Sequence, residues 1–148
     1  MRLRAIALSM CLMLQAAAMA AAKRVNMEAE GTALNAAAGE TGTGVQESAV
    51  IVVHVTDAKG NGLSALGANV GNGTTAIALP AGWSLDTVAL AVGGASVTPT
   101  QFLNLGGGSY FIRVASVATT WVSGDYIVRA AFQNASFRGS TLAEITIE

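Results

Sequence analysis

Few side chains in this sequence have the chemistry for catalysis or for metal binding. His54 is the single histidine and Cys11 the single cysteine in 148 residues. His54 lies in a run rich in valine, with no second histidine or cysteine near it to complete a metal site or a catalytic pair. We therefore expect His54 to be a half-buried strand residue that shares its face with Val50, Val52 and Thr56.

The carboxylates and serines do not assemble into a catalytic motif either. Residues 57–62 have the rhythm of a calcium loop, but Lys59 stands where the loop needs an oxygen ligand. Asp86 and Asp125 could form a glycosidase pair, yet acids this sparse are typical of turns and loops. Ser109 lacks the Gly-x-Ser-x-Gly setting of a hydrolase nucleophile. The sequence predicts a protein that is not an enzyme and that uses no metal or cofactor.

Binding chemistry is also limited. Trp83 and Trp121 are candidate ligand contacts, because two solvent-facing indole rings could stack on sugars, although tryptophans in such a chain more often pack in the core or at its rim. The 8 basic and 9 acidic residues give no cationic excess for nucleic acid. The glycine-rich stretches lack the strand, loop and helix of a phosphate site. We expect neither a nucleic-acid nor a nucleotide partner.

The N-terminal residues have the order of a secretory signal peptide. Arg2 and Arg4 are followed by an apolar stretch and then by alanines up to Ala22. We predict a signal peptide over residues 1–22, and hence a secreted, periplasmic or cell-envelope location. Cys11 lies in a weak lipoprotein-like setting, so we expect a membrane partner only if that cysteine carries lipid. Without the leader the chain has no cysteine, six basic residues and nine acidic ones.

Residues 23–48 contain few large apolar side chains and several glycines, which predicts a flexible low-complexity arm. A short helix around residues 27–38 is the alternative, because alanine and glutamate favour helices. The sequence changes at Ala49, where a run of β-branched residues begins. We therefore place the globular domain at residues 49–148.

Short segments of alternating or β-branched residues, separated by turn formers, run through this domain. They predict an all-β protein, an antiparallel β-sandwich of about seven strands. Seven of the expected strands cover residues 49–56, 74–79, 83–92, 96–105, 110–115, 126–132 and 142–147, and residues 63–70 are a weaker eighth segment, which Gly67 interrupts. The pairing between residues 70 and 105 is least defined, and Pro99 marks an edge or bulged strand. The expected core residues are Val53, Val55, Val88, Leu90, Tyr110, Ile112, Val114, Val128, Phe132 and Ile145.

Four segments resemble those of bacterial immunoglobulin-like domains. Residues 53–63 resemble the opening V-x-V-x-D-x-x-G strand, residues 108–114 the G-x-Y strand, residues 121–128 the W-x-x-G-x-Y segment, and residues 139–142 the approach to the final strand. The likeness covers about 100 residues, from 49 to 148, and lacks the paired cysteines of antibody domains. It implies an immunoglobulin-like fold of an exported protein and no single activity.

Four residues of these motifs are expected to be structural: Tyr110, Trp121, Gly124 and Tyr126. Tyr126 stands just inside a late strand, where the ring of a tyrosine can enter the core while its hydroxyl bonds to the preceding backbone, an arrangement called a tyrosine corner. Gly124 supplies the tight approach to it.

The expected function is that of a non-catalytic exported module with a structural or binding role toward a protein or cell-surface partner. A strand-donating or polymerising surface subunit is the alternative, suggested by the arm before Ala49 together with open sheet edges. A carbohydrate-binding accessory module is a further one, suggested by the two tryptophans.

Overall fold

The computed structural model describes residues 21–43, 47–116 and 119–148. Nearly all of the predicted signal peptide, including Cys11, lies outside these ranges. The described residues contain strands, turns and loops and no helix, and therefore no helix long and apolar enough to cross a membrane. The predicted all-β class is confirmed.

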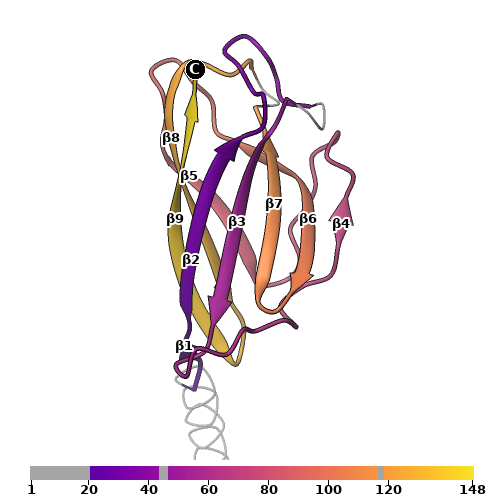
Figure 1. Ribbon diagram of the computed structural model, residues 1–148, viewed down its shortest axis with the longest axis vertical. Helices are drawn as coiled ribbons and strands as arrows, with labels where there is room; N and C mark the ends of the chain where they lie inside the picture. The colour runs from indigo at the N-terminus through magenta and orange to yellow at the C-terminus, as the bar shows by residue number, and fades with distance from the viewer. Residues whose placement is uncertain (1–20, 44–46, 117–118) are drawn as a thin grey trace, which may run out of the picture.

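Two sheets form two layers (Figure 1). The four-stranded sheet has the order β1 (Lys23–Arg24), β9 (Phe137–Ile147), β8 (Gly124–Gln133) and β5 (Trp83–Ala89). The five-stranded sheet has the order β2 (Asn26–Ala33), β3 (Ala49–Thr56), β7 (Ser109–Ala115), β6 (Thr98–Gly106) and β4 (Val70–Gly71). Neighbouring strands are antiparallel, except that β1 runs parallel to β9.

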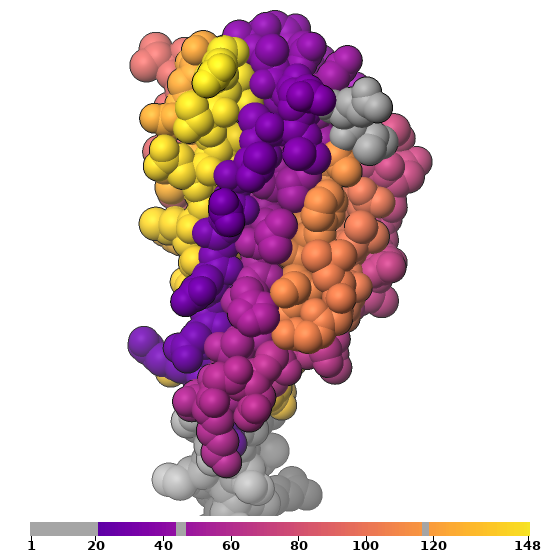
Figure 2. Space-filling model, in the orientation of Figure 1, coloured from indigo at the N-terminus to yellow at the C-terminus, as the bar shows by residue number. Residues whose placement is uncertain are grey.

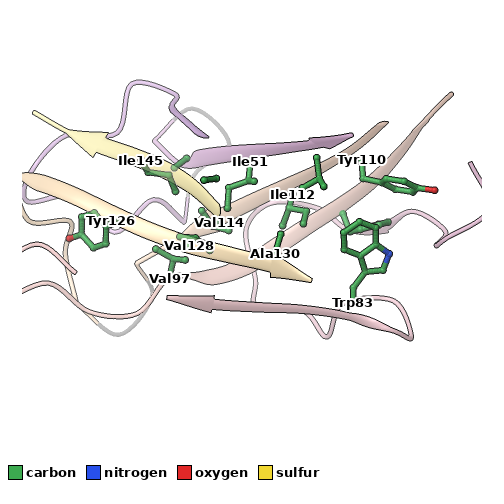
Figure 3. Close-up of a cluster of buried hydrophobic side chains, with 14 of the residues drawn as sticks. Ile51, Trp83, Val97, Tyr110, Ile112, Val114, Tyr126, Val128, Ala130 and Ile145 are labelled. Atoms are coloured by element: carbon green, nitrogen blue, oxygen red, sulfur yellow. The ribbon is translucent and has the colours of Figure 1, made fainter. Parts of the chain in front are cut away.

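The core lies between the sheets and follows from the alternation of side chains along each strand. On β3 the inward residues Ile51, Val53 and Val55 are fully buried, whereas Val52 on the opposite face is 39% exposed. Figure 3 shows the inward side chains of both sheets meeting in one cluster. Eight of the ten predicted core residues are buried: Val53, Val55, Tyr110, Ile112, Val114, Val128, Phe132 and Ile145.

Val88 and Leu90 are the two exceptions, with exposed fractions of 44% and 43%. On β5 Thr87 pairs with Val128 and Ala89 with Ile127, so Val88 is an extra residue in a β-bulge. A bulge breaks the alternation on which the prediction rested, and the residues after it turn outward. The prediction that these two side chains belong to the core is wrong.

The predicted flexible arm is also corrected. Residues 23–33 form β1 and β2, and β2 pairs with β3 over its full length, from Asn26 with Thr56 to Ala33 with Ala49. Neither an arm nor a helix is present in this segment. Its small and acidic residues gave no strand signal, because β2 is stabilised by its two neighbours in space rather than by its own composition.

Several strand boundaries between residues 57 and 142 also differ from expectation. Residues 63–69 and 72–79 are loops, with only the two-residue β4 between them. β9 begins at Phe137, well before the expected start, because the Asn134 side chain closes a tight turn by accepting hydrogen bonds from the Ser136 and Phe137 N–H groups. β6 carries the expected bulge next to Pro99.

The sandwich is closed along one side by β2 and β9, which belong to different sheets. In Figures 1 and 2 the indigo β2 runs beside the yellow β9 along the length of the molecule. A Cβ atom on Gly31 of β2 would overlap the carbonyl oxygen of Glu144 on β9. One on Gly139 would come within 2.7 Å of a Val25 methyl group. The two backbones therefore approach as closely as they do only because these positions are glycine.

We expect Gly31→Ala to destabilise the fold by about 1–3 kcal/mol, the usual cost of forcing an extra methyl group into a packed contact. The measurement is the denaturant midpoint of the purified protein. Glu30→Gln, one residue away on the exposed face of β2, is the control and should change stability by no more than about 0.5 kcal/mol. Equal stability of the Gly31→Ala variant and the native chain would show that β2 and β9 can separate.

Candidate functional site

Tyr126 has the geometry expected of a tyrosine corner. It is fully buried at the start of β8, and its hydroxyl accepts a hydrogen bond from the Val122 N–H (3.0 Å) and donates one to the Val122 carbonyl (3.2 Å). Gly124 lies between them with a φ of +131°. Trp121 packs edge-on against the Tyr126 ring at a centroid distance of 5.1 Å.

A second tyrosine and tryptophan stand at the opposite end of the core (Figure 3). The Tyr110 hydroxyl donates to the Leu63 carbonyl and accepts from the Leu66 N–H (3.1 Å), while Trp83 Nε1 donates to the Leu66 carbonyl (2.7 Å). The Trp83 and Tyr110 rings lie 5.0 Å apart. Burial raises the pKa of Tyr110, and the Leu66 N–H opposes this shift. These contacts secure a loop that has no strand of its own.

The structure argues against Trp83 and Trp121 as ligand contacts. Their exposed fractions are 7% and 1%, so neither indole face is open to a sugar. Trp121 Nε1 has no hydrogen-bond partner among the described residues, and a Cβ atom on Gly42 would lie 2.6 Å from it. Both tryptophans are packing residues, which is the alternative that the sequence left open.

His54 is more exposed than expected. It lies on the outer face of the five-stranded sheet, where its Nδ1 is 3.0 Å from Ser109 Oγ and Glu28 is its partner on β2. Glu28, His54 and Ser109 thus form a row across β2, β3 and β7, and they have the residue types of a catalytic triad. The whole row lies on the outer surface of a sheet, where a substrate would not be enclosed.

The Asp57 turn uses its carboxylate internally. One oxygen accepts hydrogen bonds from the Lys59 and Asn61 N–H groups, both at 2.9 Å, and the other accepts from the Asn61 side chain (3.2 Å). These bonds, above all that from the Asn61 N–H, hold the pKa of Asp57 below its ordinary value. The carboxylate therefore closes the turn.

Asp86 and Asp125 do not form a glycosidase pair. Asp86 on β5 faces Arg129 on β8, and Asp125 stands four residues further along β8. Four residues of strand separate the two positions by roughly 13 Å, more than a glycosidase pair spans. Asp125 instead accepts a hydrogen bond from the Thr146 hydroxyl (2.8 Å).

A feature that the sequence analysis did not anticipate lies on the outer face of the four-stranded sheet. It is a concavity of about 730 Å³, within the usual size range of ligand pockets. We call it the arginine face, because Arg24 of β1, Arg138 of β9 and Arg129 of β8 line it. Asp86 is the one carboxylate in its lining.

The register of the strands explains this shape. Ser84, Ala131 and Ser140 pair with one another across β5, β8 and β9 and form a row of small side chains. Long side chains flank this row: Arg24 and Arg138 are direct partners on one side, and Arg129 lies on the other. Small residues between long ones leave the middle of the face hollow.

The arginine face concentrates the basic residues of the chain. Six lysines and arginines follow residue 22, and three of these six line the face. Arg24, Arg129 and Arg138 are exposed, and none of them makes a side-chain hydrogen bond or ion pair with another described residue. Sequence analysis missed the cluster because β1 and β9 stand more than 100 residues apart.

Arg113, a buried cation, behaves differently from these exposed arginines. Arg113 on β7 is 8% exposed; it donates to Ser48 Oγ (2.6 Å) and to Gln101 Oε1 (3.3 Å) and lies over the Phe111 ring. Burial lowers its pKa. It is a structural residue that connects β7 to β6 and to the start of β3.

Comparisons with protein-family models, with curated proteins and with solved structures found no match to this chain. Its function is therefore argued from its geometry.

We expect Tyr126→Phe to lower the free energy of unfolding by about 1–3 kcal/mol, because it leaves the partly buried Val122 N–H and carbonyl without their partner. Tyr126→Ala should cost about 3–5 kcal/mol, since a ring-sized cavity is added. Denaturant midpoints give the ranking. Thr146→Ala removes an exposed hydrogen bond on β9 and serves as the control, with a change near 0.5 kcal/mol.

Tyr110 should make stability fall at alkaline pH. Burial raises the pKa of Tyr110 above 10.0. The protonated hydroxyl therefore makes its full contribution to the free energy of unfolding below about pH 10. As pH rises further, the unfolded chain loses this proton first, and stability decreases until the native tyrosine ionises. Unfolding free energies measured from about pH 8.5 to 11 should show a shallower decline for Tyr110→Phe. An identical decline would mean that the hydroxyl ionises as freely in the native state as in the unfolded one.

Proposed function

We propose that this chain is an exported, non-catalytic module with an immunoglobulin-like fold and a structural or binding role. The strand order carries this proposal. β2-β3-β7-β6 facing β5-β8-β9 corresponds to the A-B-E-D and C-F-G sheets of an immunoglobulin constant-type domain. The position of Tyr126 supports it as well, since tyrosine corners occur at the start of the sixth of those seven strands.

Export is proposed from the sequence of residues 1–22, in which a basic start precedes an apolar stretch and small residues. The remaining chain has no cysteine, and the tyrosine hydroxyls secure its loops without disulfides. Such a domain can fold in an oxidising compartment without an oxidant.

Two alternative functions rested on sequence features that the fold does not provide. The strand-donating subunit needed a free arm, but residues 26–33 already fill a place in the chain's own five-stranded sheet. The tryptophan-based sugar site needed exposed indoles, and both are buried. A rigid sandwich that offers its outer faces to a partner is the function that the geometry supports best.

Export is tested with alkaline phosphatase fused after Glu148 in a bacterial host, because this reporter needs an oxidising compartment to fold. We expect active fusion protein and, by mass spectrometry, a processed chain that begins at Lys23. The matched control carries Leu8→Arg and Leu12→Arg, which interrupt the apolar stretch and should abolish reporter activity. Equal activity of both fusions, or none from the native leader, would refute export.

A further inference from the structure

We propose that the arginine face binds an acidic saccharide, with sugar carboxylates held by Arg24 and Arg138 and sugar hydroxyls held toward Asp86. The inference gives the proposed binding role a ligand class, and it rests on that proposed function. Three features of the arginine face support it: the charge of the face, the residues of its floor and its length.

The positive charge of the arginine face indicates that its ligand carries an anionic group. Arg24 and Arg138 are direct register partners on adjacent strands, whose backbones lie about 4.8 Å apart. Like charges in such positions repel each other, and neither arginine has a described carboxylate as a partner. An anionic group between them would relieve this repulsion and would accept hydrogen bonds from both guanidinium groups, which match carboxylates in geometry.

The floor and the far end indicate hydroxyl groups. Ser84 and Ser140 present hydroxyls in the row of small residues, and Asp86 and Arg129 stand together beyond it. Asp86 accepts hydrogen bonds from neutral hydroxyls. Each unit of an acidic saccharide carries hydroxyls beside its carboxylate, whereas a glutamate peptide has no hydroxyls to offer Asp86, so the saccharide is the better fit.

The length of the face indicates more than a single ion. Arg138 pairs with Gln133, which stands four residues along β8 from Arg129, so the two arginines are separated by roughly 13 Å of strand. A single sulfate or phosphate ion cannot contact both ends. An oligosaccharide lying across the row of small residues can.

The test is calorimetric titration of the purified chain, with or without residues 1–22, with a hexamer of galacturonic acid. A galactose hexamer, a hexaglutamate peptide and sodium sulfate are the comparison ligands. We expect the galacturonate to bind at least about tenfold more tightly than each of the other three, and Arg24→Gln or Arg138→Gln to weaken it by about tenfold each. Added salt should weaken binding, because the contacts are charged.

Lys59→Gln is the matched control, since it removes the same charge from an exposed turn that does not line the face, and it should leave affinity unchanged. The proposal is overturned if galacturonate does not bind, if hexaglutamate or sulfate binds as tightly, or if Lys59→Gln weakens binding as much as Arg138→Gln. The circular dichroism of each variant must match that of the native chain. Export plays no part in this assay, so its result is independent of the secretion test.

Discussion

The two buried tyrosine hydroxyls secure the loops that close both ends of this sandwich. A loop over a packed core leaves backbone N–H and carbonyl groups without ladder partners, and each such group needs a hydrogen bond. Tyr126 satisfies both groups of Val122 at one end, and Tyr110 satisfies Leu63 and Leu66 at the other. In each case the ring fills the core beside a tryptophan while its one polar atom reaches the loop. The chain thus obtains with side chains what small exported domains often obtain with disulfides.

The second constraint is the closure of one side of the sandwich. β2 and β9 lie so close that Gly31 has no room for a side chain, and the parallel pair β1–β9 extends this closure. The opposite side ends at β5, an edge strand whose backbone could pair with another chain. The bulge at Val88 bends this edge and turns Val88 and Leu90 outward, which disrupts the flat hydrogen-bonding row that strand addition needs. The two sides together limit the surfaces open to a partner mainly to the outer faces of the sheets.

The sequence predicted those features whose determining residues lie close together along the chain, and it missed those set by residues far apart. The strand at residues 49–56 was predicted with its observed bounds, because it is a dense run of β-branched residues, which favour strands wherever the run lies in the fold. The Tyr126 geometry was anticipated because all of its partners lie within a few residues. β2 was missed, since its stability comes from β3 and β9 rather than from its small residues. The arginine face could not be found either, because it requires the register of β1 against β9 and of β8 against β5, which no local pattern contains.

The charge distribution gives the arginine face its significance. Arg113 is buried, and the exposed arginines that follow residue 22 all line one concavity, although acidic residues outnumber basic ones in this part of the chain. Folding alone would favour the opposite placement: an acidic partner beside Arg24 or Arg138 would remove a repulsion and add a weak surface ion pair. The carboxylates of Glu28 and Glu30 instead lie on β2, in the other sheet. The face has small residues at its centre, two arginines unpaired among the described residues at one end, and Asp86 beside Arg129 at the other. These groups contribute little to folding, and their arrangement suits a ligand that carries both carboxylates and hydroxyls.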